Sequence, residues 1–256
     1  MKTNLHTHTW RCRHARGTEQ EYIEAALRAG MEVLGFSDHA PICFPEGYYS
    51  TYRMFPEQTA DYFDTLLRLR ETYRGLIELK IGLEMEYYPD LFDATMDFLR
   101  EFPLDYMLLG QHFIRNEIDA PYVALRNKHE ADLIAYVDQC CAAMEMGRFT
   151  YLAHPDLFRF TGNPEIYRRE TIRLCETAVR TNTPLEINLL GAGSGRHYPN
   201  SDFWEIAAAC NVQAVFGCDA HDAFELLPRK EMLFWQDFLD QHNIPVLQEI
   251  SLKNPF

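Results

Sequence analysis

Seven of the ten histidines in this chain stand at the ends of short apolar runs, and two carboxylates occupy equivalent places. Neutral imidazoles and ionised carboxylates are ligands that Zn, Mn and Fe ions accept in proteins. The candidate ligands are His6, His8, His14, His39, Glu84, His112, His154, Asp219 and His221. The sequence therefore predicts a cluster of divalent metal ions.

Two short motifs place a pair of these side chains two residues apart. They are His6-Thr7-His8 and Asp219-Ala220-His221. On an extended chain, residues i and i+2 point to the same side, so both side chains of a pair can face one ion. A single motif of this kind is weak evidence. Nine ligand-competent side chains at matching positions make a metal centre the favoured interpretation.

Short apolar runs alternate with longer amphipathic segments, which predicts strands joined by helical crossovers. The expected strands are the N-terminal run and residues 33–36, 79–83, 106–109, 149–152, 185–188 and 212–216. The expected helices are residues 18–29, 56–73, 90–100, 129–146, 164–180, 201–209 and 228–242, the first with the capping-box pair Thr18 and Glu21. Seven parallel strands with crossovers predict an α/β barrel. The Pro-, Gly- and Tyr-rich range 41–55 is expected to be a loop over its site.

The candidate ligands all follow the carboxyl ends of expected strands. In a parallel barrel the loops that leave these ends gather at one face, where barrel active sites are built. Ligands that are far apart in the chain are therefore expected to meet in one pocket. The sixth strand contributes Asn188 in place of a histidine.

Length and composition fit a single domain over residues 1–256. The chain is 47% hydrophobic, which is enough for a full core, and α/β barrels often reach this size as one unit. The net charge of −14 disfavours a long nucleic acid as a partner, because the bulk surface repels phosphate backbones. No run of about 18 apolar residues predicts a membrane span. Seven scattered cysteines without a disulfide or zinc-ribbon spacing favour a cytoplasmic protein.

Several segments together resemble the polymerase and histidinol phosphatase (PHP) superfamily. They are His6-Thr7-His8-Thr9 with Cys12 and His14, Ser37-Asp38-His39, Gly82-Leu83-Glu84, Gly110-Gln111-His112-Phe113, Ala153-His154-Pro155-Asp156 and Cys218-Asp219-Ala220-His221. The segments from His154 to Arg159 and from Glu186 to Asn188 look most like stand-alone histidinol-phosphate phosphatases. The resemblance implies a distorted (β/α)7 TIM-like barrel with a trinuclear metal centre.

The resemblance also implies a division of the ligands among three divalent ions. One ion would take His6, His8, Glu84 and Asp219; a second would take Glu84 as a bridge with His112 and His154; a third would take His14, His39 and His221. The glycine-rich range 191–196 and Gln111 depart from the pattern of relatives. Because the loop after the sixth strand shapes substrate choice, its divergence leaves the exact substrate open.

The chemistry expected of such a centre is phosphomonoester hydrolysis. Two ions about 3.5–4 Å apart can lower the pKa of a bound water to roughly 7 and orient the resulting hydroxide for in-line attack on phosphorus. Among the ligands, Glu84, Asp219 and His221 are the expected catalytic residues. Arg159 and Arg196, each a few residues beyond a site strand, are candidates for clamping the phosphate, since a guanidinium offers paired donors.

Three functions remain open on the sequence. The favoured one is hydrolysis of L-histidinol phosphate in histidine biosynthesis. The second is a PHP-type phosphoesterase acting on a nucleotide or another small phosphate ester, and the third is a non-catalytic metal-binding module. In each catalytic case the partner is a small phosphorylated substrate. The sequence determines neither the oligomeric state nor the native metals among Zn, Mn and Fe.

Other polar residues have simpler expected roles. Asp38 is expected to be either a hydrogen-bond partner of a ligating imidazole or a turn residue, and Glu86 to lie behind the ligands or at the rim. His197 can face the substrate, and Cys12 is expected to be a packed thiol.

Overall fold

Six short parallel strands form the centre of the molecule. The computed structural model describes residues 1–256. The strands are β1 (Thr3–Asn4), β2 (Val33–His39), β3 (Glu78–Met85), β4 (Tyr106–Leu109), β5 (Leu185–Asn188) and β6 (Ala214–Gly217). Strands β1 to β4 are hydrogen-bonded in chain order, and β5 pairs with β6. Every pairing is parallel, as the helical crossovers between the strands require.

Single backbone bridges join these two sheets into a ring. Leu152 bridges Leu109 of β4 on one side and Leu185 of β5 on the other. On the opposite side of the ring, Thr7 bridges Ala220, and the Cys218 N–H donates to the Asn4 side chain at 2.8 Å. The expected distorted seven-membered barrel is confirmed. The expected strand 149–152 is reduced to a single residue, Leu152, which bridges both neighbouring strands.

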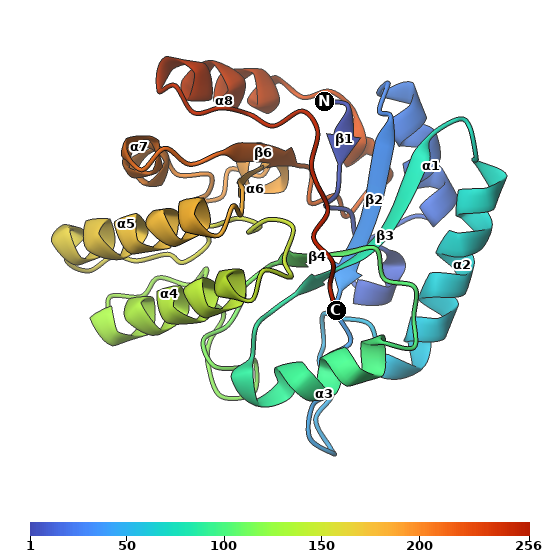
Figure 1. Cartoon of the computed structure of the whole chain (residues 1–256), viewed down its shortest axis with the longest axis horizontal. Helices are drawn as coiled ribbons and strands as arrows, with labels where there is room; N and C mark the ends of the chain where they lie inside the picture. Colours follow the sequence, from blue (N-terminus) through green and yellow to red (C-terminus); the bar gives the residue numbers. More distant parts are fainter.

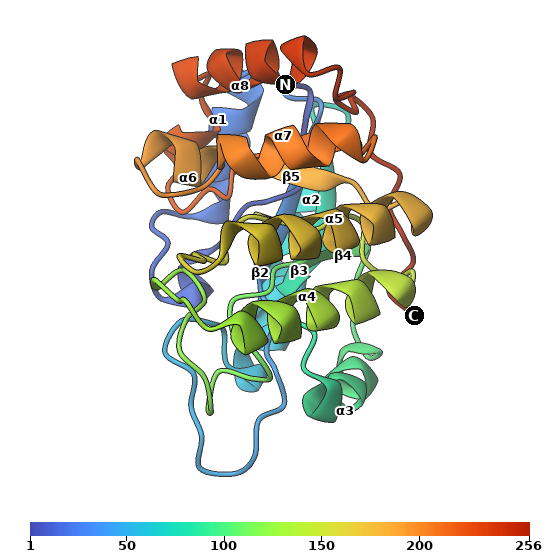
Figure 2. The same ribbon diagram turned by 90° about the vertical axis from the view of Figure 1, so that its left-hand side faces the viewer.

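Helices surround this barrel. They are α1 (Glu19–Arg28), α2 (Thr59–Thr72), α3 (Pro89–Leu99), α4 (Glu130–Glu145), α5 (Pro164–Arg180), α6 (Leu189–Gly193), α7 (Ser201–Ala209) and α8 (Lys230–Gln241), with short 3₁₀ turns at Trp10–Cys12, Pro56–Gln58 and Ala223–Leu226. Helices α1 and α2 cover one side of the strands (Figure 1), and α8, α7, α5 and α4 lie in a row on the other (Figure 2). Every expected helix is present within about three residues of its expected ends, and the Thr18–Glu21 capping box is formed.

The five-residue helix α6 was not expected. It begins after β5, and the Asn188 side chain caps it by accepting the Gly191 N–H at 2.9 Å. Two of its five residues are glycines, which disfavour a helix, so the sequence indicated only a loop there. A capping side chain compensates for that poor propensity.

The side chain of Tyr106, the first residue of β4, fills the barrel interior. The Tyr106 ring crosses the interior, and its hydroxyl donates to the Leu5 carbonyl at 2.6 Å. A Cβ at Gly35 or Gly82 would overlap the Tyr106 side chain. The two glycines therefore leave room for a large aromatic residue in a narrow barrel. Around it lies a small buried cluster formed by Leu5, Tyr106, Leu108, Tyr151, Ala153 and Val215.

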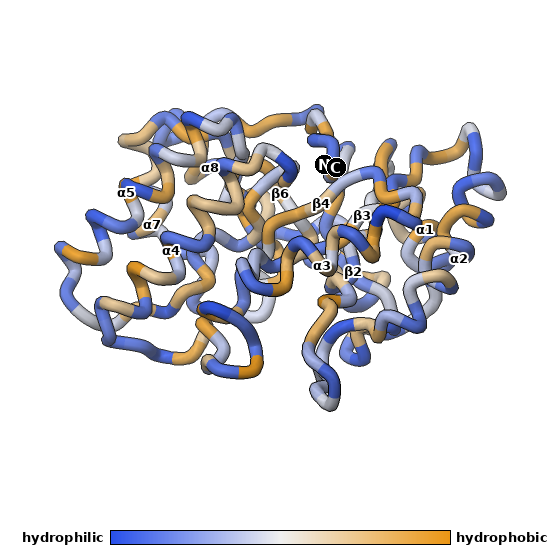
Figure 3. Tube along the Cα trace, turned by 60° about the horizontal axis from the view of Figure 1, so that its bottom comes forward, coloured by the Kyte–Doolittle hydropathy of each residue, from blue (hydrophilic) through white to orange (hydrophobic).

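A larger core of 57 buried hydrophobic residues lies between the strands and the helices. Along the outer helices hydrophobic and hydrophilic residues alternate (Figure 3), because only one face of each helix is buried. None of the helices combines the length and apolar character needed to cross a bilayer. All seven cysteines are free thiols.

Candidate metal centre

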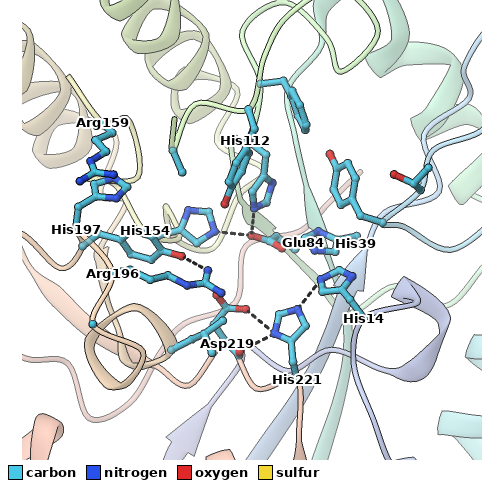
Figure 4. A pocket seen from close by; sticks show the side chains of 18 residues that line it. His14, His39, Glu84, His112, His154, Arg159, Arg196, His197, Asp219 and His221 are labelled. Carbon is cyan, nitrogen blue, oxygen red and sulfur yellow. Dashed lines mark hydrogen bonds and ion pairs between the residues drawn. The ribbon is translucent and has the colours of Figure 1, made fainter. Parts of the chain in front are cut away.

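Glu84, at the end of β3, lies at the centre of five imidazoles. Its Oε1 is 2.8 Å from His154 Nε2 and 3.5 Å from the Nε2 atoms of His6 and His112. Its Oε2 is 2.9 Å from His39 Nδ1 and 3.5 Å from His8 Nε2. The Glu84 side chain is 1% exposed. One buried carboxylate thus joins five histidines from four different segments, as Figure 4 shows in part.

The neighbouring strand makes room for this carboxylate. Gly110 directly follows β4, and a Cβ there would overlap the Glu84 carboxyl group. In the same way, a Cβ at Gly217 would overlap the carboxyl group of Glu186. Both acids face the barrel interior, where only a residue without a side chain leaves space beside them.

Asp219 and His221 complete the centre from the loop after β6. Asp219 Oδ1 lies 3.1 Å from His8 Nε2 and 3.5 Å from both His6 Nε2 and His221 Nδ1. His221 Nε2 lies 2.9 Å from His14 Nε2, and the His14 and His39 rings are 5.5 Å apart. The structure therefore brings all nine predicted side chains together at the carboxyl ends of the strands.

Donor atoms of these residues lie close enough to share ions. Sets of three whose ligand atoms all lie within 4.8 Å of one another include His6, His8 and Asp219; His14, His39 and His221; His6, Glu84 and His154; and His8, His39 and Glu84. Glu84 belongs to two of these sets. Cys12 forms a further set with His8 and His221, and in the metal-free protein burial raises the pKa of its thiol.

Three acidic residues hold the imidazoles from behind. Glu186 Oε1 lies 2.7 Å from His6 Nδ1, and its Oε2 accepts the backbone N–H of His154 at 3.0 Å. Glu86 Oε1 lies 3.0 Å from His112 Nδ1. Asp38 Oδ1 lies 3.6 Å from His8 Nδ1. Such partners orient a histidine and raise the basicity of its other nitrogen.

Several polar atoms that face inward lack hydrogen-bond partners. His6 Nε2, His8 Nε2, His39 Nδ1 and Glu84 Oε2 are all buried without a hydrogen bond. Nδ1 of His14 faces the Cys12 carbonyl at 2.8 Å, and Nδ1 of His221 faces the Asp219 carbonyl at 2.9 Å. Both Nδ1 atoms therefore donate, and the two Nε2 atoms face each other as acceptors. Two acceptors in contact repel each other unless a proton or a cation lies between them.

The lowered pKa values of His14 and His221 indicate that no proton lies between their facing nitrogens. Burial lowers the pKa of His14, and burial together with the nearby His8 lowers that of His221 to about 3. Neither ring is therefore protonated at neutral pH, so a divalent cation is the species that fits between them. This donor set of nitrogen and carboxylate atoms suits Zn, Mn or Fe.

The pKa values of His6 and His8 are raised instead of lowered. Burial alone would lower the pKa of His8, but Asp219 and Asp38 raise it to about 9, and Glu186, Asp219 and Glu84 raise the pKa of His6 well above its usual value. Burial would likewise raise the pKa of Glu84, but His112, His39 and His6 hold it well below its usual range. In the metal-free protein His6 and His8 carry the positive charge that cations would otherwise supply.

Two of the candidate ligands have left-handed backbones. The φ angle is 31° at His154 and 49° at Asp219. Such a conformation costs on the order of 1–3 kcal/mol for a residue other than glycine and is concentrated at functional sites. At His154 it is maintained by the hydrogen bond from the backbone N–H to Glu186.

A cavity of about 740 Å³ opens onto these side chains. Arg159 and Arg196, the two arginines suggested by the sequence, both line it together with His197 (Figure 4). Arg196 Nη1 donates to the Tyr198 hydroxyl at 2.6 Å. The cavity thus joins the carboxylate and imidazole cluster to cationic side chains on one side.

Other residues of the site were not found from the sequence. Tyr122 and Tyr198 line the cavity, and Glu186 supports two candidate ligands. Glu186 stood in a segment that carries the family resemblance, but the sequence assigned it no role. Of the tyrosines in the range 41–55, Tyr52 lines the cavity, whereas Tyr49 is 72% exposed.

Comparisons with known proteins agree with this geometry. The family model described as PHP domain matches residues 4–189. The chain is 28% identical over 230 residues to the "Probable histidinol-phosphatase" of Deinococcus radiodurans, covering 86% of each chain. It is 24% identical over 262 residues to the histidinol-phosphatase of Bacillus subtilis, covering 87% of this chain and 94% of that one.

A solved structure has the same fold. It is the histidinol phosphate phosphatase of Lactococcus lactis, complexed with Zn, L-histidinol and phosphate. The TM-score is 0.73 at 18% identity, and the alignment covers 98% of this chain and 97% of that one.

Proposed function

Because the chain belongs to the PHP domain family, we propose that it is a metal-dependent phosphomonoesterase that hydrolyses L-histidinol phosphate to L-histidinol and phosphate. The observation that carries this proposal is the convergence of five imidazoles on the buried Glu84 carboxylate beside a cavity with two arginines. Relatives named histidinol-phosphatase in Deinococcus radiodurans and Bacillus subtilis, and the zinc-containing complex from Lactococcus lactis, support the choice of substrate.

We further propose that the centre holds three divalent ions. Their ligands would be His6, His8, Glu84 and Asp219; Glu84, His112 and His154; and His14, His39 and His221. The facing nitrogens of His14 and His221 and the unpartnered atoms around Glu84 support this assignment. When bound, such ions activate water and phosphoryl oxygens as Lewis acids. Metal analysis of protein loaded with Zn, Mn or Fe should return three ions per chain.

The protein residues have separate roles in this proposal. Glu84, Asp219 and His221 are the catalytic residues, because they lie where the reacting phosphate would meet the ligands. Arg159 and Arg196 would hold the phosphate oxygens through paired N–H donors. Glu186 and Glu86 keep His6 and His112 in orientation from behind.

The test is a substrate panel with the metal-loaded protein. It contains L-histidinol phosphate, nucleoside monophosphates and short single-stranded DNA. We expect kcat/KM to be highest for L-histidinol phosphate. A preference of about tenfold or more for a nucleotide would replace this substrate with the second candidate, and no turnover of any ester by the loaded protein would indicate a metal-binding module.

The remaining proposals concern the whole chain. We propose one phosphoesterase domain over residues 1–256, supported by a single large core that extends from Tyr22 to Ile244. A cytoplasmic location is supported by seven free cysteines. The net charge of −14 supports a small phosphorylated substrate in preference to a long nucleic acid.

A further inference from the structure

Arg53 is a fully buried arginine in the loop that follows β2. Its side chain is 2% exposed and forms no hydrogen bond or ion pair with a candidate ligand. It lies between two buried carboxylates, Glu86 and Glu117, whose side chains are 0% and 1% exposed. A buried arginine with two carboxylates is a costly arrangement to maintain, so its contacts indicate a specific task.

All five donors of the Arg53 guanidinium are engaged. Nη1 donates to Glu86 Oε2 and to the Ala40 carbonyl, both at 2.9 Å. Nη2 donates to Glu86 Oε1 at 2.8 Å and to Glu117 Oε2 at 2.7 Å, and Nε donates to Glu117 Oε2 at 3.0 Å. The fork therefore grips both oxygens of Glu86, which fixes the plane of that carboxylate.

The Glu86 carboxylate in turn faces the metal centre. Its Oε1 is shared by Arg53, by the Tyr52 hydroxyl at 2.9 Å and by His112 Nδ1 at 3.0 Å. His112 Nε2, on the far side of the ring, points to Glu84 Oε1 at 3.5 Å. A rigid chain of contacts thus connects Arg53 to the inward nitrogen of His112.

The same loop is held from its other side by Arg13. The Arg13 side chain donates to the Arg53 carbonyl at 2.8 Å and also to the Ser50 carbonyl. Its guanidinium lies 4.2 Å from the centre of the Phe55 ring. Arg13 directly precedes the candidate ligand His14, so the loop is attached to two ligand-bearing segments.

From this geometry we propose that Arg53 is a positioning residue. Through Glu86 it holds His112 in the orientation that binds metal. The position of loop 41–55 therefore affects the metal affinity of the site formed by Glu84, His112 and His154. The inference rests on the proposed metal centre. Its physical basis is that an imidazole held by an oriented carboxylate presents a fixed and more basic nitrogen to an ion.

The test variant is Arg53→Lys, which keeps the charge but replaces the five-donor fork with a single ammonium. The matched control is Arg173→Lys, because Arg173 also joins two carboxylates, Asp138 and Glu170, but does so on the outer helices α4 and α5. Loaded proteins are dialysed against graded chelator, and the metal content per chain is measured together with the Co²⁺ absorption spectrum. Far-UV circular dichroism reports the fold.

We expect Arg53→Lys to lose one ion at about ten- to a hundredfold lower chelator concentration than the wild type, with an altered Co²⁺ spectrum. Added metal should restore kcat with KM unchanged. The control should match the wild type. Wild-type metal retention in a folded Arg53→Lys protein would overturn the proposal.

Glu86→Gln provides the second measurement, including the case in which Arg53→Lys does not fold. This isosteric change should lower metal retention to a similar degree, and wild-type retention in it would likewise overturn the proposal. Because Arg53 acts through Glu86, the double variant should lose little more than either single variant, whereas additive losses would contradict the proposed chain. Metal retention needs no substrate, so a failure of the histidinol phosphate assay leaves this test unaffected.

Discussion

The two ends of the barrel interior are filled by opposite chemistry. Toward the amino-terminal ends of the strands, Tyr106, Tyr151 and their neighbours form an apolar cluster against which the C-terminal residues Ile250 and Leu252 pack. At the carboxyl ends, buried histidines and acids leave several polar atoms without partners. The apolar end therefore stabilises the barrel, whereas the polar end has buried donor and acceptor atoms that are free to bind a ligand.

The C-terminal segment stabilises the apolar end. The C-terminal segment runs across it (Figure 1), where the Ala214 N–H donates to the Pro245 carbonyl at 2.9 Å. Lys253 Nζ donates to the Thr183 hydroxyl at 2.8 Å, and the Lys253 N–H donates to the Thr150 hydroxyl at 3.3 Å. This closure keeps water from the cluster, so substitutions at the two ends should separate stability from activity.

The largest effect is expected from Glu84→Gln at the polar end. The variant keeps the size of the side chain but removes the charge that five imidazoles face, and Glu84 is the proposed ligand of two ions. We expect kcat to fall by several orders of magnitude and metal content to drop, with His6→Ala less severe. Steady-state kinetics and metal analysis check this result, and a wild-type rate would refute the proposed centre.

Leu108→Ala probes the apolar end. Leu108 is fully buried in the interior cluster, and loss of its side chain leaves a cavity that should lower the free energy of unfolding by about 2–5 kcal/mol. Chemical denaturation measures the change. Activity per folded molecule should stay near that of the wild type, and a selective loss of kcat would show that the two ends are not separate.

Arg159→Ala tests the cavity beyond the metal centre. Hydrogen bonds to charged groups contribute about 1.5–3 kcal/mol, so KM for the phosphomonoester should rise about ten- to a hundredfold. Metal content should stay unchanged, because Arg159 contacts none of the candidate ligands. Arg196→Ala should have the smaller effect, since Tyr198 already occupies one of its donors. Unchanged kinetics for Arg159→Ala would remove that residue from the site.

Glu186→Gln tests the buried carboxylate that supports two candidate ligands. It weakens the support of His6 Nδ1 and of the His154 backbone, and we expect metal affinity to fall about ten- to a hundredfold. The matched control is Glu170→Gln, another buried carboxylate, which pairs with arginines on α5. Chelator titration followed by metal analysis distinguishes them, and equal metal loss in both would contradict the assigned role.

The smallest expected effect is the pH dependence of the metal-free protein. Burial opposes protonation of His8, but Asp219 and Asp38 raise its pKa from 6.5 to about 9. The stability that His8 contributes is therefore fully present below pH 6.5 and is lost as the pH rises through 9. Thermal unfolding of the chelated protein should show a lower Tm at pH 9 than at pH 6.5, whereas a constant or rising Tm would contradict the shift.

The sequence predicted the convergence of the candidate ligands better than it predicted their surroundings. All nine candidate side chains converge, because each lies at or beyond the carboxyl end of a strand and the strands are parallel. No role was predicted for Glu186 or Arg53, since a glutamate in a strand and an arginine in a loop carry no local sign of what they contact.

By itself, the sequence determined which donor atoms are available and the order in which the strands present them. Periodicity and residue type are local properties, and they are enough to place histidines and acids at strand ends. Only the tertiary structure decided that five imidazoles share the Glu84 carboxylate, that glycines at positions 110 and 217 leave room for buried acids, and that Arg53 reaches His112 through Glu86. Those contacts join residues far apart in the chain, and burial sets the strength of their electrostatic interactions.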